Sequence, residues 1–545
     1  MSRFLRAARL SAFILCALMV FVACEQIYRG IEFFADDGTG HIFKISLPDD
    51  PVTLDPQLCN DPNGVIITKN LFAGLMDYDE NGRLIGRMAE DYVISSDGLS
   101  YTFYLKQGYK WHAVGDFEAP VTAHDFVFGF RRLMDPKTVS PHSEKYYCIL
   151  GAESARKGQT DPSEIGVEAL DDYTLKFTLE YQNAEFLYLL ADLPAMPCCE
   201  EFFNSAGGKY GLEAEAMCSN GPFYVRYWLH DQYGSDNYVR LRRNSGYSEA
   251  SYVSAGGINY LITPDASVRA SDFAGGSTDM ILYHAGEHPA IDSDYYIAGY
   301  TSTAGLIFNE SRDIFKSEEV RQVFSWAIDR DMLNAGTPSL LLPADGMIPT
   351  STVLMSKGYS PRIPDEVSVT NTSMAEYKWN FLLTEKQKSS LIGMSVMVSS
   401  DLGYSDYLSA LSDSWYSVFG THISIDIATP RDYAERLKKG DYDIAVVTVG
   451  SSTANVLDYI KPFGGAKTYG YSLPEVVSAV KSEGRYDSMT ALNYACSEGE
   501  NAVLAGYHFI PLWQLPAVCI YDDDCADIRF DAFSDTVYFE NAKNF

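Results

Sequence analysis

SSDGLSYTFYLKQGYKWHAVGDFEAPVTAHDFVFGFRRLMDP, residues 95–136, contains the clearest folding signals of the chain. Asp97-Gly98 predicts a turn, because glycine adopts a positive φ without steric cost. The residues that follow alternate in polarity, which is the period of a half-buried β-strand. The apolar face of that strand holds Tyr101, Phe103 and Leu105. We therefore expect a strand that leaves a tight turn.

A helix is predicted after Pro120, which ends the preceding segment. Thr122 and Asp125 resemble a capping box, with Asp in place of the usual Glu or Gln. Apolar side chains then recur at helical spacing until Asp135-Pro136, where the proline stops the helix. The buried face of the helix is expected to contain Phe126, Phe130, Leu133 and Met134.

The composition describes a large, acidic, globular protein. Its 545 residues are too many for one ordinary core and predict two or three lobes. Hydrophobic residues make up 46% of the chain, which excludes a disordered protein. The 73 acidic and 42 basic residues give a net charge of −31, so the chain lacks a basic footprint for nucleic acid. We expect no nucleic-acid partner and a solvated acidic surface.

The N-terminus predicts export and lipid attachment. Three arginines precede the apolar run 10–23, which is too short for an ordinary membrane span and fits a signal peptide. The run ends just before Cys24 in a pattern that resembles a bacterial lipobox, although Phe21 stands where Leu is usual. We expect residues 1–23 to be the signal peptide, Cys24 to carry lipid and residues 24–40 to form a tether. A plain secretory signal cut nearby is the alternative.

Eight cysteines remain after Cys24, an even number that permits disulfides in an exported protein. Cys519 and Cys525 flank a turn-like run of three aspartates, so they are candidates for closing a small loop. The sequence leaves all other pairings open. A metal site is the poorer interpretation, because paired C-x-x-C motifs do not occur.

Three blocks of the opening stretch resemble one protein family in their order and spacing. They are the runs 97–106, 110–111 and 120–126. Together they look like the signature of the extracellular solute-binding proteins of oligopeptide ABC importers, solute-binding family 5. The block at 315–333 is also similar to that family and predicts a single helix by its apolar spacing. Further similar blocks lie at 52–56, 70–75, 89–90, 220–223, 239–244, 273–280 and 509–513.

The resemblance implies an α/β fold of the periplasmic-binding-protein type. Such a fold is a clamshell of two large lobes plus a smaller extra domain, and it is discontinuous in sequence. The extra domain is expected at 81–190 and lobe II at 299–505. The two crossings between the lobes would then act as a hinge. Lobe I is expected to contain residues 41–80, 191–298 and 506–545.

Peptide-binding members of the family enclose an extended peptide between the lobes. The resemblance implies backbone pairing by the strand at 303–309, and a later segment in which an aspartate holds the α-ammonium of the peptide. In this chain Val449 stands at the family's Trp position, Ser452 stands at the Asp position, and Ala73 replaces a Glu. An uncharged serine cannot neutralise a buried ammonium, so either another carboxylate does so or the ligand differs. The expected ligand-binding residues are Ala73, Gly305, Leu306, Ile307, Val449, Ser451, Ser452 and Thr453.

The run 284–288, His-Ala-Gly-Glu-His, matches the H-x-x-E-H pattern of inverted zinc peptidases. That chemistry needs both histidines on one helical face around a metal. Gly286 and Pro289 oppose a sustained helix, so a polar loop is the better interpretation. We expect no catalysis, no metal and no cofactor.

We expect a binding lipoprotein that captures an extracellular solute, foremost an oligopeptide, and delivers it to the permease subunits of an ABC importer. The protein is expected to be a monomer, held by the lipid on Cys24 at the outer face of the bacterial cell membrane or in the periplasm. A non-peptide small solute is the main variant. A receptor or surface lipoprotein that has lost transport is a second class, and an exported hydrolase is a third.

Replacing Cys24 with Ser is expected to release the protein into the soluble exported fraction, because the thiol that would carry the lipid is lost. Cell fractionation followed by immunoblotting measures the membrane-bound share. The matched variant Cys16→Ser, inside the expected signal peptide, should leave that share unchanged. Wild-type membrane association of Cys24→Ser would contradict lipidation.

Overall fold

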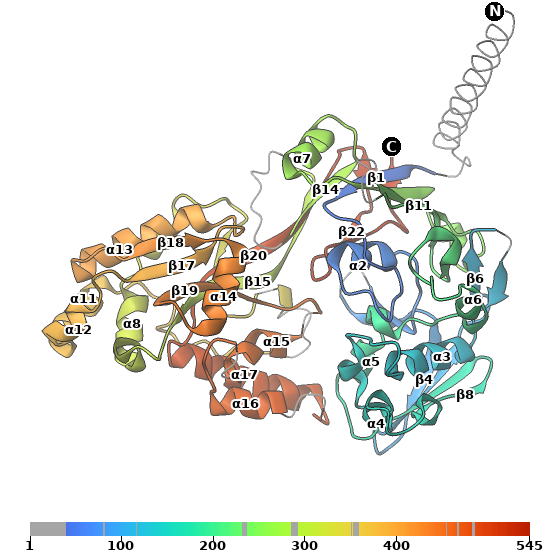
Figure 1. Ribbon diagram of the computed structural model, residues 1–545, viewed down its shortest axis with the longest axis horizontal. Helices are drawn as coiled ribbons and strands as arrows, with labels where there is room; N and C mark the ends of the chain where they lie inside the picture. The colour runs from blue at the N-terminus through green and yellow to red at the C-terminus, as the bar shows by residue number, and fades with distance from the viewer. Residues whose placement is uncertain are drawn as a thin grey trace, which may run out of the picture.

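The computed structural model of the protein describes residues 40–79, 82–115, 117–231, 237–284, 293–349, 351–352, 359–453, 455–465, 468–481 and 485–545. Two lobes stand side by side, and a smaller domain extends from one of them (Figure 1). Segments from the beginning, the middle and the end of the chain build lobe I, whereas the yellow and orange segments build lobe II. The expected α/β clamshell is confirmed.

One sheet of 11 strands runs through both lobes. Strands of lobe I form one end of the sheet, strands of lobe II form the other, and β20 and β15 lie between them. The order is β11 (Phe223–Leu229), β12 (Tyr238–Arg243), β13 (Gly257–Ile262), β1 (Ile42–Leu47), β14 (Met280–Tyr283), β20 (Ile510–Tyr521), β15 (Tyr296–Phe308), β19 (Ile444–Gly450), β17 (Ser395–Ser399) and β18 (Ser424–Ala428), with β16 (Leu342–Pro343) paired to β20.

The two longest strands of this sheet connect the lobes. β15 and β20 have 13 and 12 residues and pair with each other in antiparallel fashion. In lobe I β20 also pairs with β14, and in lobe II β15 also pairs with β19. The β15 register against β20 shifts between Tyr300 and Ser302 and again between Ala304 and Gly305. The crossings between the lobes therefore lie inside paired strands, while the domain boundaries stay predictions.

Lobe II buries both faces of its part of the sheet. Side chains alternate along β15, so Leu306 and Phe308 pack on one face and Ile307 packs on the other. The first face is covered by α8 (Glu318–Trp326), α11 (Thr372–Leu382) and α13 (Ser409–Phe419), and the second by α15 (Val456–Ile460), α16 (Pro474–Lys481) and α17 (Met489–Ala505).

The extra domain contains the strand and the helix expected from residues 95–136. Its four-stranded sheet has the order β4 (Ala89–Ile94), β5 (Ser100–Leu105), β9 (Thr174–Thr178) and β8 (Val167–Asp171). At the start of α3 (Ala123–Met134), the Asp125 carboxylate accepts hydrogen bonds from the Thr122 N–H at 2.7 Å and from the Thr122 hydroxyl at 3.2 Å. Burial raises the pKa of Asp125 to about 6. The predicted strand, helix and helix start are confirmed.

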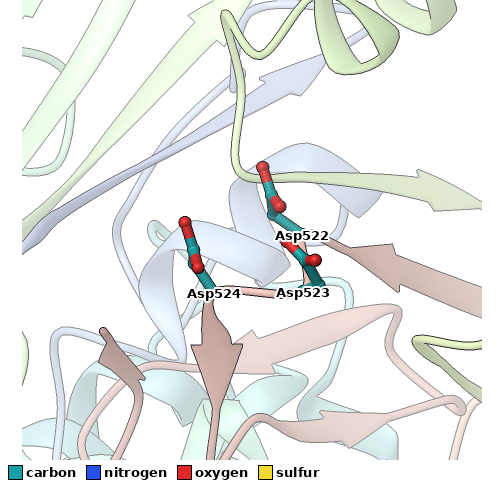
Figure 2. Close-up of side chains that lie close together, drawn as sticks. All are labelled: Asp522, Asp523 and Asp524. Carbon is teal, nitrogen blue, oxygen red and sulfur yellow. The ribbon is translucent and has the colours of Figure 1, made fainter.

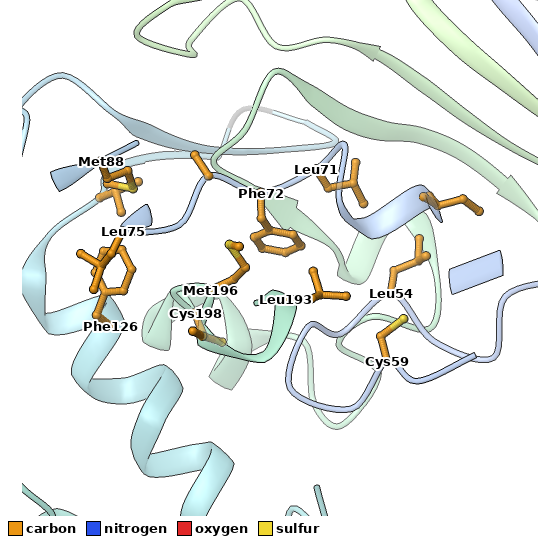
Figure 3. Close-up of a cluster of buried hydrophobic side chains, with 14 of the residues drawn as sticks. Leu54, Cys59, Leu71, Phe72, Leu75, Met88, Phe126, Leu193, Met196 and Cys198 are labelled. Carbon is orange, nitrogen blue, oxygen red and sulfur yellow. The ribbon is translucent and has the colours of Figure 1, made fainter. Parts of the chain in front are cut away.

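A buried ion pair joins the extra domain to lobe I. The Arg132 guanidinium of α3 lies 2.5 Å from Asp55 Oδ2, and these side chains are 8% and 2% exposed. Apolar side chains of the two parts belong to a single cluster, which includes Phe126 of α3 and Leu75 (Figure 3). The extra domain and lobe I therefore share one core.

Two local expectations differ from the structure. Residues 315–333 form two helices, α8 and α9 (Arg330–Asn334), because Asp329 accepts a hydrogen bond from the Met332 N–H at 2.9 Å and starts the second helix. Cys519 and Cys525 are free thiols and do not form a disulfide. Cys519 is held within β20 by pairing on both sides, and Cys525 accepts a hydrogen bond from Asn544.

Replacing Asp55 with Ala is expected to lower the free energy of unfolding by about 3–5 kcal/mol, because the buried Arg132 charge loses its partner. Urea denaturation followed by tryptophan fluorescence measures this loss. The matched variant Glu153→Ala breaks an exposed pair with Lys157 and should cost less than about 1 kcal/mol. Equal losses in the two variants would show that the buried pair does not stabilise the fold.

Candidate functional site

The segment that follows β19 lies on the side of lobe II toward lobe I. β19 ends at Gly450 and α15 begins at Val456. Figure 1 shows α15 on the side of lobe II that faces α2 (Pro62–Thr68) of lobe I. Val449 pairs with Thr303 and is 2% exposed, so its side chain belongs to the core of the lobe. The next side chains along the chain, at 451–453, leave that core.

Ser451 organises this turn. Its hydroxyl donates a hydrogen bond to Asp458 Oδ2 at 2.8 Å. The same oxygen accepts hydrogen bonds from the N–H groups of Thr453 and Asn455, at 3.1 and 3.0 Å. Ser451 therefore holds the turn together, whereas the side chains of Ser452 and Thr453 are exposed.

Asp458 is a carboxylate of the site that the sequence reasoning missed. It lies on α15, 28% exposed, and its Oδ1 is 3.1 Å from Lys461 Nζ. Part of its negative charge is thus neutralised by the residue that follows the helix. The sequence does place an acidic residue, Asp458, shortly after the serines. Its contact with Ser451, however, depends on the conformation of the turn between β19 and α15.

Tyr459 ties α15 to the strand that crosses between the lobes. Its hydroxyl donates a hydrogen bond to the Thr301 carbonyl at 2.7 Å and lies 2.6 Å from the Thr352 hydroxyl. Burial raises the pKa of Tyr459 well above its usual value, so the phenol stays protonated and remains a donor. Nearby, the Tyr300 N–H donates to the Ser351 hydroxyl at 3.1 Å. The site segment and the crossing strand are therefore mechanically connected.

Gly305, Leu306 and Ile307 lie inside the sheet of lobe II. They pair with Val447, Val446 and Ala445 of β19, and the first two also pair with Pro511 and Ile510 of β20. Leu306 and Ile307 are fully buried. At Gly305 and Leu306 both strand edges are occupied, which leaves no free edge for an extended ligand. We therefore leave these three residues out of the proposed site.

Ala73 lies in lobe I, away from the lobe II residues in sequence and in the fold. The Asn220 side chain accepts a hydrogen bond from the Ala73 N–H at 3.0 Å and donates one to the Ala73 carbonyl at 2.8 Å. Ala73 is 3% exposed. It borders a small pocket of about 30 Å³ that is also lined by Lys69, Phe72, Gly74, Met76, Asp77, Arg87, Ala191, Leu193, Met196 and Tyr538.

Lys69 provides a charge at the rim of this pocket. Its Nζ lies 2.8 Å from Asp531 Oδ2 and donates a hydrogen bond to the Ser534 hydroxyl at 2.9 Å. Burial by itself would lower the pKa of Lys69, but the charge and the hydrogen bond of Asp531, together with Tyr538 and Asp192, outweigh burial and raise the pKa above its usual value. The lysine therefore stays charged and is held by lobe I itself.

Two other groups of titratable side chains provide no candidate site. The carboxylate oxygens of Asp522, Asp523 and Asp524 lie within 4.8 Å of one another after β20 (Figure 2). We assign no metal to them, because Ca²⁺ takes about six to eight oxygen ligands and Asp523 and Asp524 are exposed to solvent. His284 Nδ1 lies 2.7 Å from Asp535 Oδ2. The rest of the H-x-x-E-H motif lies outside the described residues.

The structure bears on membrane attachment in one respect. Within the part of the chain that the structure describes, every helix is too short or too polar to cross a membrane. Cys24 and the expected signal peptide lie outside that part.

Two relatives are similar to this chain over most of its length. The "Oligopeptide-binding protein OppA" of Bacillus subtilis (strain 168) is 23% identical over 515 residues, which cover 92% of each chain. The "Probable deoxycholate-binding periplasmic protein YgiS" of Escherichia coli (strain K12) is 26% identical over 414 residues, which cover 74% of each chain.

Solved structures share the fold. The Escherichia coli murein tripeptide binding protein MppA superposes with a TM-score of 0.69 at 18% identity, covering 93% of this chain and 98% of MppA. Haemophilus influenzae OppA in complex with RPPGFSPFR superposes with a TM-score of 0.68 at 18% identity, covering 93% of this chain and 99% of that one. The model of the family described as "Bacterial extracellular solute-binding proteins, family 5 Middle" matches residues 83–471, more than half of the chain. The resemblance found in the sequence is thus confirmed, and the chain belongs to the bacterial extracellular solute-binding proteins of family 5.

Proposed function

We propose that the protein is the substrate-binding lipoprotein of an ABC importer and that it encloses an oligopeptide between its lobes. The observation that carries the proposal is the sheet that continues through both lobes, with the exposed turn 451–453 beside the strands that cross. Relatives named as oligopeptide-binding proteins and a solved relative in complex with RPPGFSPFR support the peptide class. A ligand that contacts both lobes favours the closed arrangement, because it binds that arrangement better.

The proposed contacts come from both lobes. Ser452 and Thr453 contribute hydroxyl and backbone groups from lobe II, and Ala73 contributes a wall of the pocket in lobe I. Val449 and Ser451 shape the turn from within. Neutral hydrogen bonds are about half as strong as charge-assisted ones, so we propose that recognition of the peptide α-ammonium is weak at this turn.

The remaining assignments follow from the same proposal. The protein carries lipid on Cys24, works as a monomer outside the cytoplasm, and presents its ligand to the permease subunits without doing chemistry. The description of the family as bacterial extracellular solute-binding proteins supports this location. The proposed domain boundaries are those expected from the sequence.

A non-peptide solute is the second candidate. Two observations favour it: Ser452 stands where peptide binders carry an aspartate, and one relative is named for deoxycholate. A solute without an ammonium group makes no demand for a carboxylate at this position. A receptor or surface lipoprotein that has lost transport would bind the same ligands, and neighbouring permease and ATPase genes would argue against it.

The first test identifies the ligand and its charge requirement. Mass spectrometry of the purified protein identifies co-purified solutes, and calorimetry compares one bound peptide with its N-acetylated form. Acetylation is expected to weaken binding by less than about tenfold, because residue 452 offers no charge to lose. A loss above about a hundredfold, roughly 3 kcal/mol, means that another residue supplies the charge. Binding of deoxycholate without binding of any peptide would replace the peptide class by the second candidate.

The second test separates the two neighbouring serines. Ser451→Ala is expected to lower the free energy of unfolding by about 1 kcal/mol, because Asp458 and two N–H groups lose their common partner. Ser452→Ala is expected to leave stability unchanged and to weaken binding of the same peptide severalfold. Urea denaturation and calorimetry measure the two effects. Full peptide affinity in Ser452→Ala removes residue 452 from the proposed site.

A further inference from the structure

A second contact joins the lobes far from the crossing strands. The Ala184 N–H of the extra domain donates a hydrogen bond to the Tyr486 carbonyl of lobe II at 2.9 Å. The Arg485 guanidinium lies 5.1 Å from the centre of the Tyr181 ring, within range of a cation–π interaction. Two pairs of residues thus meet across the domains.

Both sides of this contact are fixed to their own domains. In the extra domain, Gln182 donates a hydrogen bond to the Asp97 carbonyl at 2.7 Å. The neighbouring Asn183 is 5% exposed and its Oδ1 accepts a hydrogen bond from the Glu185 N–H at 2.8 Å. In lobe II the Tyr486 hydroxyl donates to the Ala479 carbonyl of α16 at 3.3 Å. Hydrogen bonds within each domain therefore fix Gln182, Asn183 and Tyr486 at the contact.

The contact lies far from the strands that connect the lobes. Figure 1 shows β15 and β20 joining the upper parts of the lobes, whereas α16, α17 and α5 (Phe186–Leu189) lie below them. Tyr486 lies shortly before α17, and Ala184 lies just before α5. When two bodies rotate about a hinge, points far from the axis separate most. The contact at 181–184 and 485–486 must therefore break when the lobes open.

We propose that these four residues, Tyr181, Ala184, Arg485 and Tyr486, form a latch that holds the lobes together at the end opposite the crossing strands. The extra domain then influences the equilibrium between open and closed molecules, because it provides one side of the latch. For ligand retention the inference rests on the proposed function, but the latch itself acts with or without a ligand. Removal of the Arg485 side chain should raise the ratio of open to closed molecules about two- to fivefold, the worth of an exposed cation–π contact.

The test compares Arg485→Ala with Tyr181→Phe, which keeps the aromatic ring that faces the guanidinium. The matched control is Arg431→Ala on α14 (Pro430–Lys439), where the arginine side chain is 91% exposed. Small-angle scattering without added ligand is expected to give a larger radius of gyration for Arg485→Ala and no change for Tyr181→Phe or for the control. Hydrogen exchange of the peptide containing Ala184 should be about two- to fivefold faster in Arg485→Ala.

Two readouts keep the outcomes distinct. Thermal melting checks that each variant is folded, and a change in exchange at 298–303 would mean that the crossing itself was disturbed. An unchanged radius together with unchanged exchange at Ala184 overturns the latch. An equimolar library of tri- to hexapeptides then tests retention, with faster release expected from Arg485→Ala. If no library peptide binds the wild type, the proposed function fails while the scattering result still decides on the latch.

Discussion

The antiparallel pairing of β15 with β20 is the constraint on which the rest of the molecule depends. In lobe II this pair of strands is tightly packed. A Cβ added at Gly305 would lie 2.3 Å from Phe509 Cζ, which is closer than real atoms approach. Residues 303–308 of β15 are buried, whereas most of residues 296–302 are at least partly exposed. Bending between the lobes therefore concentrates where fewer side chains cover the strands, near the register shift at Tyr300 and Ser302. The lobes are therefore connected through paired strands of one sheet, and opening requires those strands to bend or twist.

The extra domain belongs mechanically to lobe I. The Asp55–Arg132 pair and the common apolar cluster leave it no independent core. It therefore moves with lobe I as one body, and its contact with residues 485–486 is a contact between the two bodies that open and close. Within lobe II, Tyr459 connects the turn 451–453 to β15 through its hydrogen bond to the Thr301 carbonyl. A structural change at the turn is therefore transmitted to β15, and a change in β15 is transmitted to the turn.

The sequence predicted those parts of the molecule whose signals are local. The strand Ser100–Leu105 and the helix Ala123–Met134 follow from alternation and from Thr122 and Asp125, which are neighbours in the chain. The break between α8 and α9 was missed because its apolar spacing is that of one helix, while a single side chain, Asp329, restarts it. Within the site, Ser452 and Thr453 are exposed, and their contact with ligand stays a prediction. The burial of Gly305 and Leu306 between two strands and the approach of Asp458 to Ser451 depend on residues distant in the chain, which periodicity cannot reveal.

Lobe I is assembled from both ends of the polypeptide, and this sets the order in which the protein becomes folded. β1 pairs with β14, β14 pairs with β20, and Asn70 donates a hydrogen bond to the Val537 carbonyl at 2.9 Å. The ring of Phe43 packs 5.2 Å from that of Phe539. Because a ribosome synthesises the chain from its N-terminus, β1 waits for about half of the polypeptide before its partners β13 and β14 exist, and the contacts with Val537 and Phe539 form only when the chain is almost complete. The lobe that begins first is therefore completed last, because its sheet and core need the C-terminal residues 510–539.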